Sequence, residues 1–177
     1  MVTFHSKYNG DKSIPSLCGV AFAPIKTKFG GPAQVLPESE EEDIIDEAIG
    51  YFRVQCLFKN FKVEGPADLL MIYMTCFIQK CLEVIVKDQN DQSKATKAVL
   101  ALAMQEVPGV SSKGFFLGNL CTVVKSEEGK LSQYMKQIKQ ELSKRILNII
   151  YNPEWGTLDM KFWLSYSKKK FLNMTFN

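Results

Sequence analysis

The stretch LLMIYMTCFIQKCLEVIV, from Leu69 to Val86, decides the fold, because it is either a membrane span or the centre of a helical protein. Its first eleven residues carry no charge, and Lys80 and Glu83 then interrupt it. A spanning helix needs about 20 apolar residues. One charged side chain near the middle of a span costs roughly 2.5–3.5 kcal/mol, which nearly cancels the gain from the apolar residues. We therefore predict no membrane insertion.

The residues before this stretch favour a helix of a globular protein. Pro66 follows Gly65, and a proline in the first turn of a helix loses no hydrogen bond. Asp68 also falls in the first turn, where a negative charge meets the positive end of the helix dipole. A helix that is apolar nearly all round is buried on all sides. We expect a central hydrophobic helix at about residues 66–86, surrounded by the other helices.

Apolar periodicity predicts four further helices around the central one. Their expected ranges are about Asp43–Phe61, Ser93–Val107, Glu127–Tyr151 and Leu158–Asn173. The third has the strongest pattern, with apolar residues recurring every three or four positions: Leu131, Met135, Ile138, Leu142, Ile146 and Ile149. Strand-like alternation is scarce. The predicted fold class is therefore all-α, with about five helices in a single domain, 1–177.

Residues 1–42 differ from the rest because prolines and glycines punctuate them. We expect an irregular N-terminal arm packed on the helical body. Ser39 and Glu42 have the spacing of a capping box, in which the two side chains bond each other's backbone N–H groups. The acidic run from Glu38 to Asp43 is thus predicted to begin the first helix rather than to bind metal.

The residues that could support catalysis are few. The chain has five cysteines, without a CxxC pair, and His5 is its one histidine, so no zinc-site spacing can be built. Nucleophilic catalysis typically uses a serine or cysteine beside a histidine base. The one histidine, His5, lies in the expected N-terminal arm. We predict no enzyme activity, no catalytic residue, no metal and no cofactor. Cysteines inside apolar helical segments indicate a reducing compartment, the cytosol or the nucleus.

Charge is spread unevenly along the chain. Residues 1–124 have a net charge of −2, and residues 125–177 have a net charge of +5. The candidate partner-binding residues are Lys161, Lys168, Lys169 and Lys170, with Trp163 and Phe171 beside them. Such a surface could face an acidic partner such as actin, nucleic acid or a lipid surface. Equally, the lysines could complement a helix dipole while the aromatic residues belong to the core.

Several segments, in the same order, resemble the family of subunit 3 of the actin-related protein 2/3 complex. The most specific is ADLLMIYMTCFIQKCL (67–82), and the others are APIKTKFGGPA (23–33), DIIDEAIGYFRVQCLFKNF (43–61), YMKQIKQEL…RI (134–146) and KFWLSYSKKKFLNMTF (161–176). Gly50 departs from the pattern, because the family usually has an aromatic residue there. Residues 88–130 match only loosely, so contacts made by that region in the family are not carried over.

The resemblance implies a helical fold with one surrounded helix and a non-catalytic role. The complex nucleates a new actin filament on the side of an existing one. The subunit is expected to pack chiefly on the actin-related protein 3 subunit, near the mother filament, in the cytoplasm at the actin cytoskeleton of the cell cortex. In this interpretation Lys161 and Lys168–Lys170 face an acidic, actin-like surface, and no nucleic acid is bound. The alternative is a free-standing helical adaptor that binds acidic lipid or RNA through its basic C-terminal third.

Overall fold

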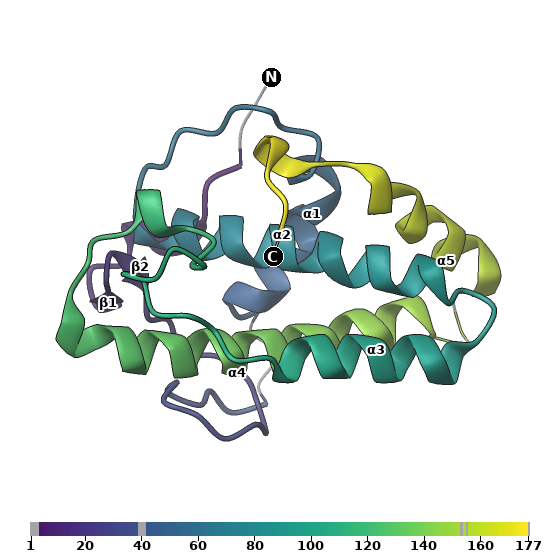
Figure 1. Cartoon of the computed structure of the whole chain (residues 1–177), viewed down its shortest axis with the longest axis horizontal. Coiled ribbons are helices and arrows are strands. Elements are labelled where there is room, and N and C mark those ends of the chain that lie inside the picture. The colour runs from purple at the N-terminus through teal and green to yellow at the C-terminus, as the bar shows by residue number, and fades with distance from the viewer. Residues whose placement is uncertain (1–3, 39–41, 153, 155, 177) are drawn as a thin grey trace.

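The structure is built around one long apolar helix (Figure 1). It is a computed structural model that describes residues 4–38, 42–152, 154 and 156–176, with the backbone alone for 156–159. Helix α2 (Pro66–Lys87) contacts each of the other four α-helices. Every residue from Ala67 to Gln79 is buried. The prediction of a surrounded central helix is confirmed, and its expected bounds are one residue short at the C-terminal end.

Helix α2 is long and apolar enough to cross a membrane by length and composition, but it lies inside the protein. In its most apolar window of 18 residues, 78% is buried by the rest of the chain. A core helix passes the same test of hydropathy as a spanning helix, and its burial on all sides accounts for the apolar sequence.

The N-terminus of α2 is capped by the N-terminal arm. Gly65 is the N-cap residue and has no side chain to bond the first N–H groups. The Asn9 side-chain oxygen accepts hydrogen bonds from the N–H groups of Ala67 and Asp68, at 3.0 and 3.3 Å. A Cβ at position 65 would lie 2.5 Å from that oxygen, so the arm can approach because the residue is glycine.

The four remaining helices are α1 (Ile44–Gln55), α3 (Gln92–Met104), α4 (Lys125–Ile150) and α5 (Gly156–Leu164). Helices α3 and α4 lie side by side along one edge of the molecule (Figure 1). The first helix ends six residues earlier than predicted, since the chain tightens into turns after Gln55. The last predicted helix breaks up into α5 and two 3₁₀ turns, Ser165–Lys168 and Phe171–Asn173. Leu172 and Asn173 have φ of 52° and 55°, which no α-helix can contain.

The arm contains a small sheet that the sequence did not predict. Strands β1 (Ser16–Leu17) and β2 (Val20–Ala21) pair antiparallel through the turn at Cys18 and Gly19, which both have positive φ. Two residues per strand are too few for alternation to be recognised in the sequence. The fold is therefore mostly helical, with five α-helices and a two-stranded sheet among the described residues, and the all-α prediction needs this correction.

Helix α1 begins with a capping box, but one formed by other residues than predicted. The Asp43 side chain accepts from the N–H groups of Ile45 and Asp46, and Asp46 bonds back to the N–H of Asp43. The predicted partner Ser39 lies outside the described residues. The acidic run thus begins the helix, as expected, through its last member.

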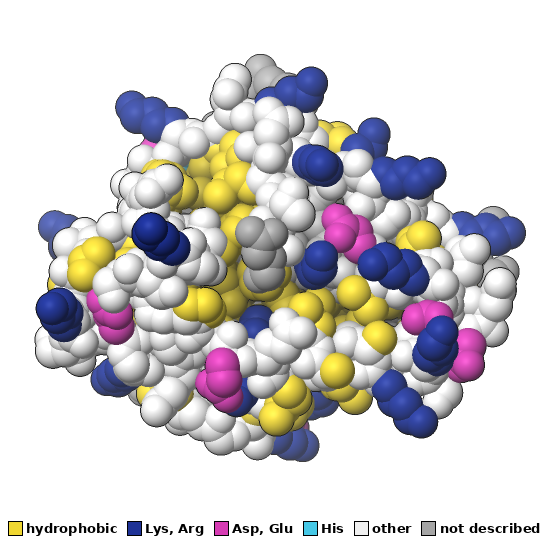
Figure 2. Space-filling model, viewed as in Figure 1, with side chains coloured by type: hydrophobic (Ala, Val, Ile, Leu, Met, Phe, Trp, Pro, Cys, Tyr) yellow, Lys and Arg dark blue, Asp and Glu magenta, His cyan; other side chains and the backbone are white. Residues whose placement is uncertain are grey.

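One hydrophobic cluster joins the arm, all five helices and the C-terminal segment. Phe176 packs its ring against Tyr73, Phe77 and Phe116, each at a centroid distance of 5.3 Å. Gln79 holds the same segment to α2 by accepting from the N–H of Phe171 at 3.1 Å. Hydrophobic side chains show in the hollow at the middle of this face (Figure 2). The C-terminal segment, as far as Phe176, is therefore part of the core.

Candidate functional site

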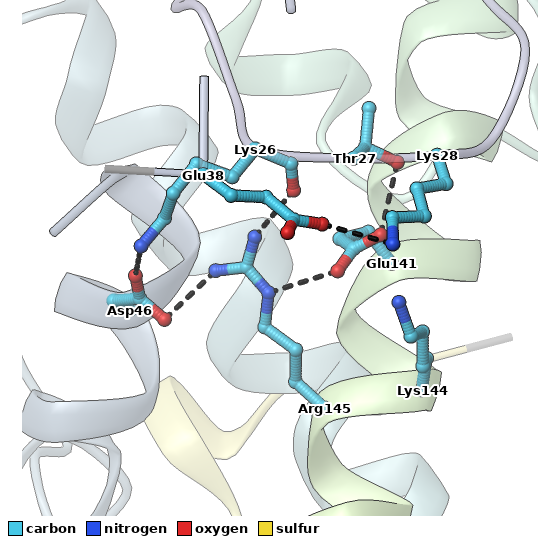
Figure 3. Close-up of a pocket in the computed structure, with 8 residues that line it drawn as sticks. All are labelled: Lys26, Thr27, Lys28, Glu38, Asp46, Glu141, Lys144 and Arg145. Carbon is cyan, nitrogen blue, oxygen red and sulfur yellow. Dashed lines mark hydrogen bonds and ion pairs between the residues drawn. The ribbon is translucent and has the colours of Figure 1, made fainter. Parts of the chain in front are cut away.

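A hollow of about 250 Å³ lies where the arm meets α1 and α4 (Figure 3). Arg145 of α4 lies at its base and donates to Asp43 at 2.6 and 2.7 Å, to Asp46 at 2.8 Å, to Glu141 at 3.0 Å and to the carbonyl of Lys26 at 2.6 Å. We call these five residues the Arg145 clamp. Their contacts tie three segments of the chain together through one guanidinium group.

Most of the remaining groups around this hollow pair with one another, and Lys144 is the one charged residue of its lining without an ion pair among the described residues. Lys26 contacts Asp46 at 2.8 Å, and Lys28 contacts Glu38 at 3.0 Å. Thr27 donates to the second oxygen of Glu141 at 2.9 Å. Cations and carboxylates therefore balance across the hollow, which favours a structural role over the binding of a charged ligand.

Burial and ion pairing act in opposite directions on the Asp43 carboxyl. Its burial raises the pKa, but hydrogen bonds from Arg145 and from two backbone N–H groups outweigh that effect and lower the pKa. Asp43 is therefore held as a carboxylate with no exposed surface. A buried charge of this kind is stable only while its partners stay in place.

His5 ties the arm to the helices. Its Nδ1 lies 2.8 Å from the buried Asp68 carboxylate, at the start of α2. The neighbouring Ser6 hydroxyl donates to Glu47 of α1 at 2.6 Å. Within the residues that the structure describes, no group of three or more His, Cys, Asp or Glu side chains could hold a metal ion. These polar residues hold the arm in position.

Four of the five cysteine thiols are buried, and all five are free. Burial raises the pKa of Cys56 to about 11 and the pKa values of Cys76 and Cys81 to about 12. A thiol with a raised pKa is a poor nucleophile, because the thiolate is the reactive form. These three behave as small apolar core residues.

Lys139 of α4 is a buried lysine beneath the central hollow. Its side chain is 3% exposed, and its amine donates to the carbonyl of Gln105, just after α3, at 2.7 Å. Burial, with a smaller contribution from Lys136, lowers the pKa of Lys139 to about 8, and Glu106 opposes that shift. The folded protein therefore favours the neutral amine more than the unfolded chain does.

We expect Lys139 to make the free energy of unfolding depend on pH. Between about pH 8 and its ordinary pKa of 10.5, the unfolded chain binds more protons at this position than the folded protein does, so its contribution to stability rises with pH. Urea unfolding of the wild type and of Lys139→Met across this range measures it. The wild type should gain stability relative to the variant. Cysteines and tyrosines titrate in both proteins, so their contribution cancels when the free energy of unfolding of the variant is subtracted from that of the wild type. A difference that stays constant with pH would contradict the prediction.

The structure places all four predicted lysines on the surface. Lys161 lies in α5, Lys168 ends the 3₁₀ turn after it, and Lys169 and Lys170 follow, all exposed. The two aromatic residues predicted beside them are not part of that surface. Trp163 is 7% exposed and Phe171 is fully buried, so both belong to the core.

Three cations that the sequence did not point to lie on the segment against which this region packs. They are Arg53 in α1 and Lys59 and Lys62 after it, all exposed. The segments meet where the N–H of Leu172 donates to the carbonyl of Phe58 at 2.9 Å. We call the seven cations the basic face: Arg53, Lys59, Lys62, Lys161, Lys168, Lys169 and Lys170. About a hundred residues separate its two parts, so no local sequence pattern could join them.

Comparison with known proteins gives a consistent result over nearly the whole chain. The family model described as "P21-Arc: ARP2/3 complex ARPC3 (21 kDa) subunit" matches residues 1–176. Proteins named "Actin-related protein 2/3 complex subunit 3" are similar: the one from Schizosaccharomyces pombe is 37% identical and the one from Arabidopsis thaliana 34%, each over 98% of both chains. That of Dictyostelium discoideum is 36% identical over 97% of this chain and 98% of its own. This chain therefore belongs to the P21-Arc family, the 21 kDa subunit of the ARP2/3 complex.

Proposed function

We propose that this chain is a non-catalytic, architectural subunit of the actin-related protein 2/3 complex, folded as a single domain. It packs chiefly on the actin-related protein 3 subunit and lies near the mother filament, in the cytoplasm at the actin cytoskeleton of the cell cortex. The observation that carries the proposal is family membership along the whole chain, at 34–37% identity to subunits of that name. Family membership does not support the alternative of a free-standing adaptor for lipid or RNA.

The structure supports a role in assembly through the way its polar groups are used. The Arg145 clamp and the His5 contacts hold the arm to the body. The exposed lysines at the C-terminal end take part in no ion pair among the described residues, so they are available to a partner.

Co-purification tests the proposed function. The tagged chain, expressed in its cell of origin, should be recovered with both actin-related proteins and with the remaining subunits in fixed proportion. Gel filtration should place it in one large assembly. Recovery as a monomer, or with partners that include no actin-related protein, would refute the proposal.

The C-terminal lysines should contribute to contact with acidic actin-like surfaces. We expect Lys168→Glu/Lys169→Glu/Lys170→Glu to weaken complex assembly or filament binding about tenfold at low salt, since opposite charges become like charges. The loss should shrink at about 0.3 M salt because exposed charges are then screened. Co-purification and filament co-sedimentation measure the two effects. Unchanged behaviour of a folded variant would remove these lysines from the interface.

A further inference from the structure

Two of the five cysteines, Cys18 in the arm and Cys121 just before α4, lie on segments that contact each other. We propose that they form a dithiol pair, which closes into a disulfide when hydrogen peroxide oxidises it and then locks the arm to the connection between α3 and α4. The three other cysteines stay reduced in the core. This inference does not depend on the proposed function, because it concerns contacts within one chain.

Backbone contacts bring the two segments together. The connection between α3 and α4 passes the two-stranded sheet of the arm (Figure 1), and the N–H of Thr122 donates to the carbonyl of Cys18 at 2.9 Å. Chain segments joined by such a bond run about 5 Å apart. Cys121 precedes Thr122 in the sequence, so we infer a Cα separation from Cys18 close to the range of about 4.4–6.8 Å that disulfides span.

The two thiols also act on each other. Burial raises the pKa of Cys121 to about 11, and the neighbouring thiol of Cys18 adds to that rise. Such an interaction falls off with distance, so the two sulfur atoms are near each other. The Cys18 side chain is 1% exposed, and its thiol donates to the carbonyl of Val124 at 3.6 Å. Both thiols therefore lie at the junction of the arm and the connection.

Cys18 occupies a backbone position that seldom holds a cysteine. Its φ is 50° and that of Gly19 is 83°, so both residues of the turn between β1 and β2 have positive φ. The first position of such a turn usually holds Asn, Asp or Gly. The N–H of Cys18 donates to Glu127 of α4 at 2.7 Å, which holds the turn in place. Backbone strain gathers at functional sites, and here it fixes one thiol beside a second.

The reaction begins at Cys121, because that side chain is partly exposed and Cys18 is buried. The Cys121 thiolate attacks one oxygen of hydrogen peroxide, the O–O bond breaks, and a sulfenic acid and hydroxide form. The Cys18 sulfur then attacks the Cys121 sulfur, the S–O bond breaks, and a second hydroxide leaves. The two thiol protons convert both hydroxides to water, so two thiols and one peroxide give one disulfide and two waters. Glutathione reverses the step by thiol–disulfide exchange.

The raised pKa of Cys121 makes this reaction slow at neutral pH. Only the thiolate attacks peroxide. With a pKa of about 11, about one Cys121 side chain in ten thousand is a thiolate at pH 7. The pair therefore responds to prolonged oxidation rather than to a brief pulse, and it stays reduced in a reducing compartment.

The disulfide would close a loop of about a hundred residues, from Cys18 to Cys121. A bond between positions so far apart in the sequence restricts the unfolded chain strongly. It would also fix the connection before α4, on which Leu120 and Val123 are exposed, relative to the arm. The bond is thus a covalent addition to the noncovalent contacts that already hold the arm to the body.

The test uses the full chain, purified in its reduced form, with Cys121→Ser as the variant. The matched control is Cys56→Ser, which removes a buried cysteine outside the pair. Each protein is held in millimolar hydrogen peroxide at about pH 8 for several hours, since the thiolate fraction is larger there than at neutral pH. Free thiols are then alkylated in denaturant, and non-reducing digests are analysed by mass spectrometry. Circular dichroism gives the melting temperature before and after treatment.

We expect one main cross-link in the wild type and in Cys56→Ser, between the peptides of Cys18 and Cys121 of the same chain. After treatment, the melting temperature of the wild type should exceed that of Cys121→Ser by about 5–15 °C more than it did before, because the bond restricts the unfolded chain. Dithiothreitol should remove both the cross-link and this gain. In Cys121→Ser, Cys18 should remain a free thiol.

Other results would overturn the inference. If Cys121 became a sulfinic acid while Cys18 stayed reduced, or if both thiols stayed unmodified, the two sulfur atoms could not meet. A disulfide between two chains, or one that includes Cys56, Cys76 or Cys81, would place the reactivity elsewhere. The mass spectrum of the wild type decides these points without any variant. A Cys18–Cys121 bond that gives no gain in melting temperature would show that it does not lock the arm.

Discussion

Replacing Ile72 with asparagine is expected to leave the protein largely unfolded at 25 °C. Ile72 lies in the middle of α2 and is 1% exposed. Truncating a buried aliphatic side chain costs about 2–5 kcal/mol, and burying an amide without a partner costs about 1–3 kcal/mol more. The sum takes most of the 5–15 kcal/mol that stabilises a typical domain. Circular dichroism and urea unfolding measure the change.

The matched control is Leu100→Asn in α3. Leucine and isoleucine are isomers, so the change in volume and polarity is the same, but Leu100 is 42% exposed. We expect its free energy of unfolding to stay within about 1 kcal/mol of the wild type, because its amide can reach water. Cooperative unfolding of Ile72→Asn at the wild-type urea midpoint would contradict the central position of α2.

The central helix could be predicted because its sequence is determined by burial alone. Helix α2 is surrounded, so its first three turns admit almost no charge, and the run from Leu69 to Gln79 shows this directly. The ends of helices depend instead on contacts from distant segments. Asn9 caps α2, and the backbone reversal at Leu172 ends the last helical segment. Neither the cap from Asn9 nor the reversal at Leu172 can be recognised from the sequence of the helix that it bounds.

The basic face also has one part that the local sequence reveals and one part that depends on packing between distant segments. The run of three lysines from Lys168 to Lys170 is visible in the sequence, and it is exposed as predicted. Arg53 joins it only through the packing of α1 on α5. Trp163 and Phe171 resemble surface aromatics when they are read beside lysines, but both are buried: Trp163 lies in α5 and Phe171 in the 3₁₀ turn Phe171–Asn173.

The Arg145 clamp could not be predicted from the sequence, because an acidic residue before a helix is already explained by capping. Asp43 does cap α1, yet its two oxygens also accept from Arg145, 102 residues away. Capping therefore explains why an acidic residue precedes α1, but it does not reveal the contact between Asp43 and Arg145. Its contribution to stability is open to direct measurement.

Arg145→Met is expected to lower the free energy of unfolding by about 3–5 kcal/mol. Removing one partner of a buried ion pair leaves the other as an uncompensated buried charge. Here Asp43 has no exposed surface, the Glu141 side chain is 5% exposed, and the carbonyl of Lys26 also loses its donor. The free energy of unfolding of Arg145→Lys should lie between those of the wild type and Arg145→Met, since lysine keeps the charge but lacks the planar fork of the guanidinium. Urea unfolding gives both values.

Lys144→Met is the control, because it removes one charge from the adjacent position of the same helix. Lys144 is exposed and takes part in no ion pair among the described residues, so its loss should cost less than about 0.5 kcal/mol. If the two variants were equally stable, the clamp would contribute nothing beyond its surface charge.

Acid distinguishes loss of charge from loss of packing in Arg145→Met. In the wild type the pKa of Asp43 is lowered, so its contribution is present above the ordinary value of 3.8 and is lost as the pH falls below it. In the variant, burial acts without the guanidinium, and the pKa of Asp43 should rise above that value. Protonation then relieves the buried charge, so the difference in stability between the two proteins should narrow from about pH 7 to pH 4. A difference that stays constant across this range would mean that the methionine variant is destabilised by packing alone, and that Arg145 joins the arm to α1 and α4 by its shape rather than by its charge.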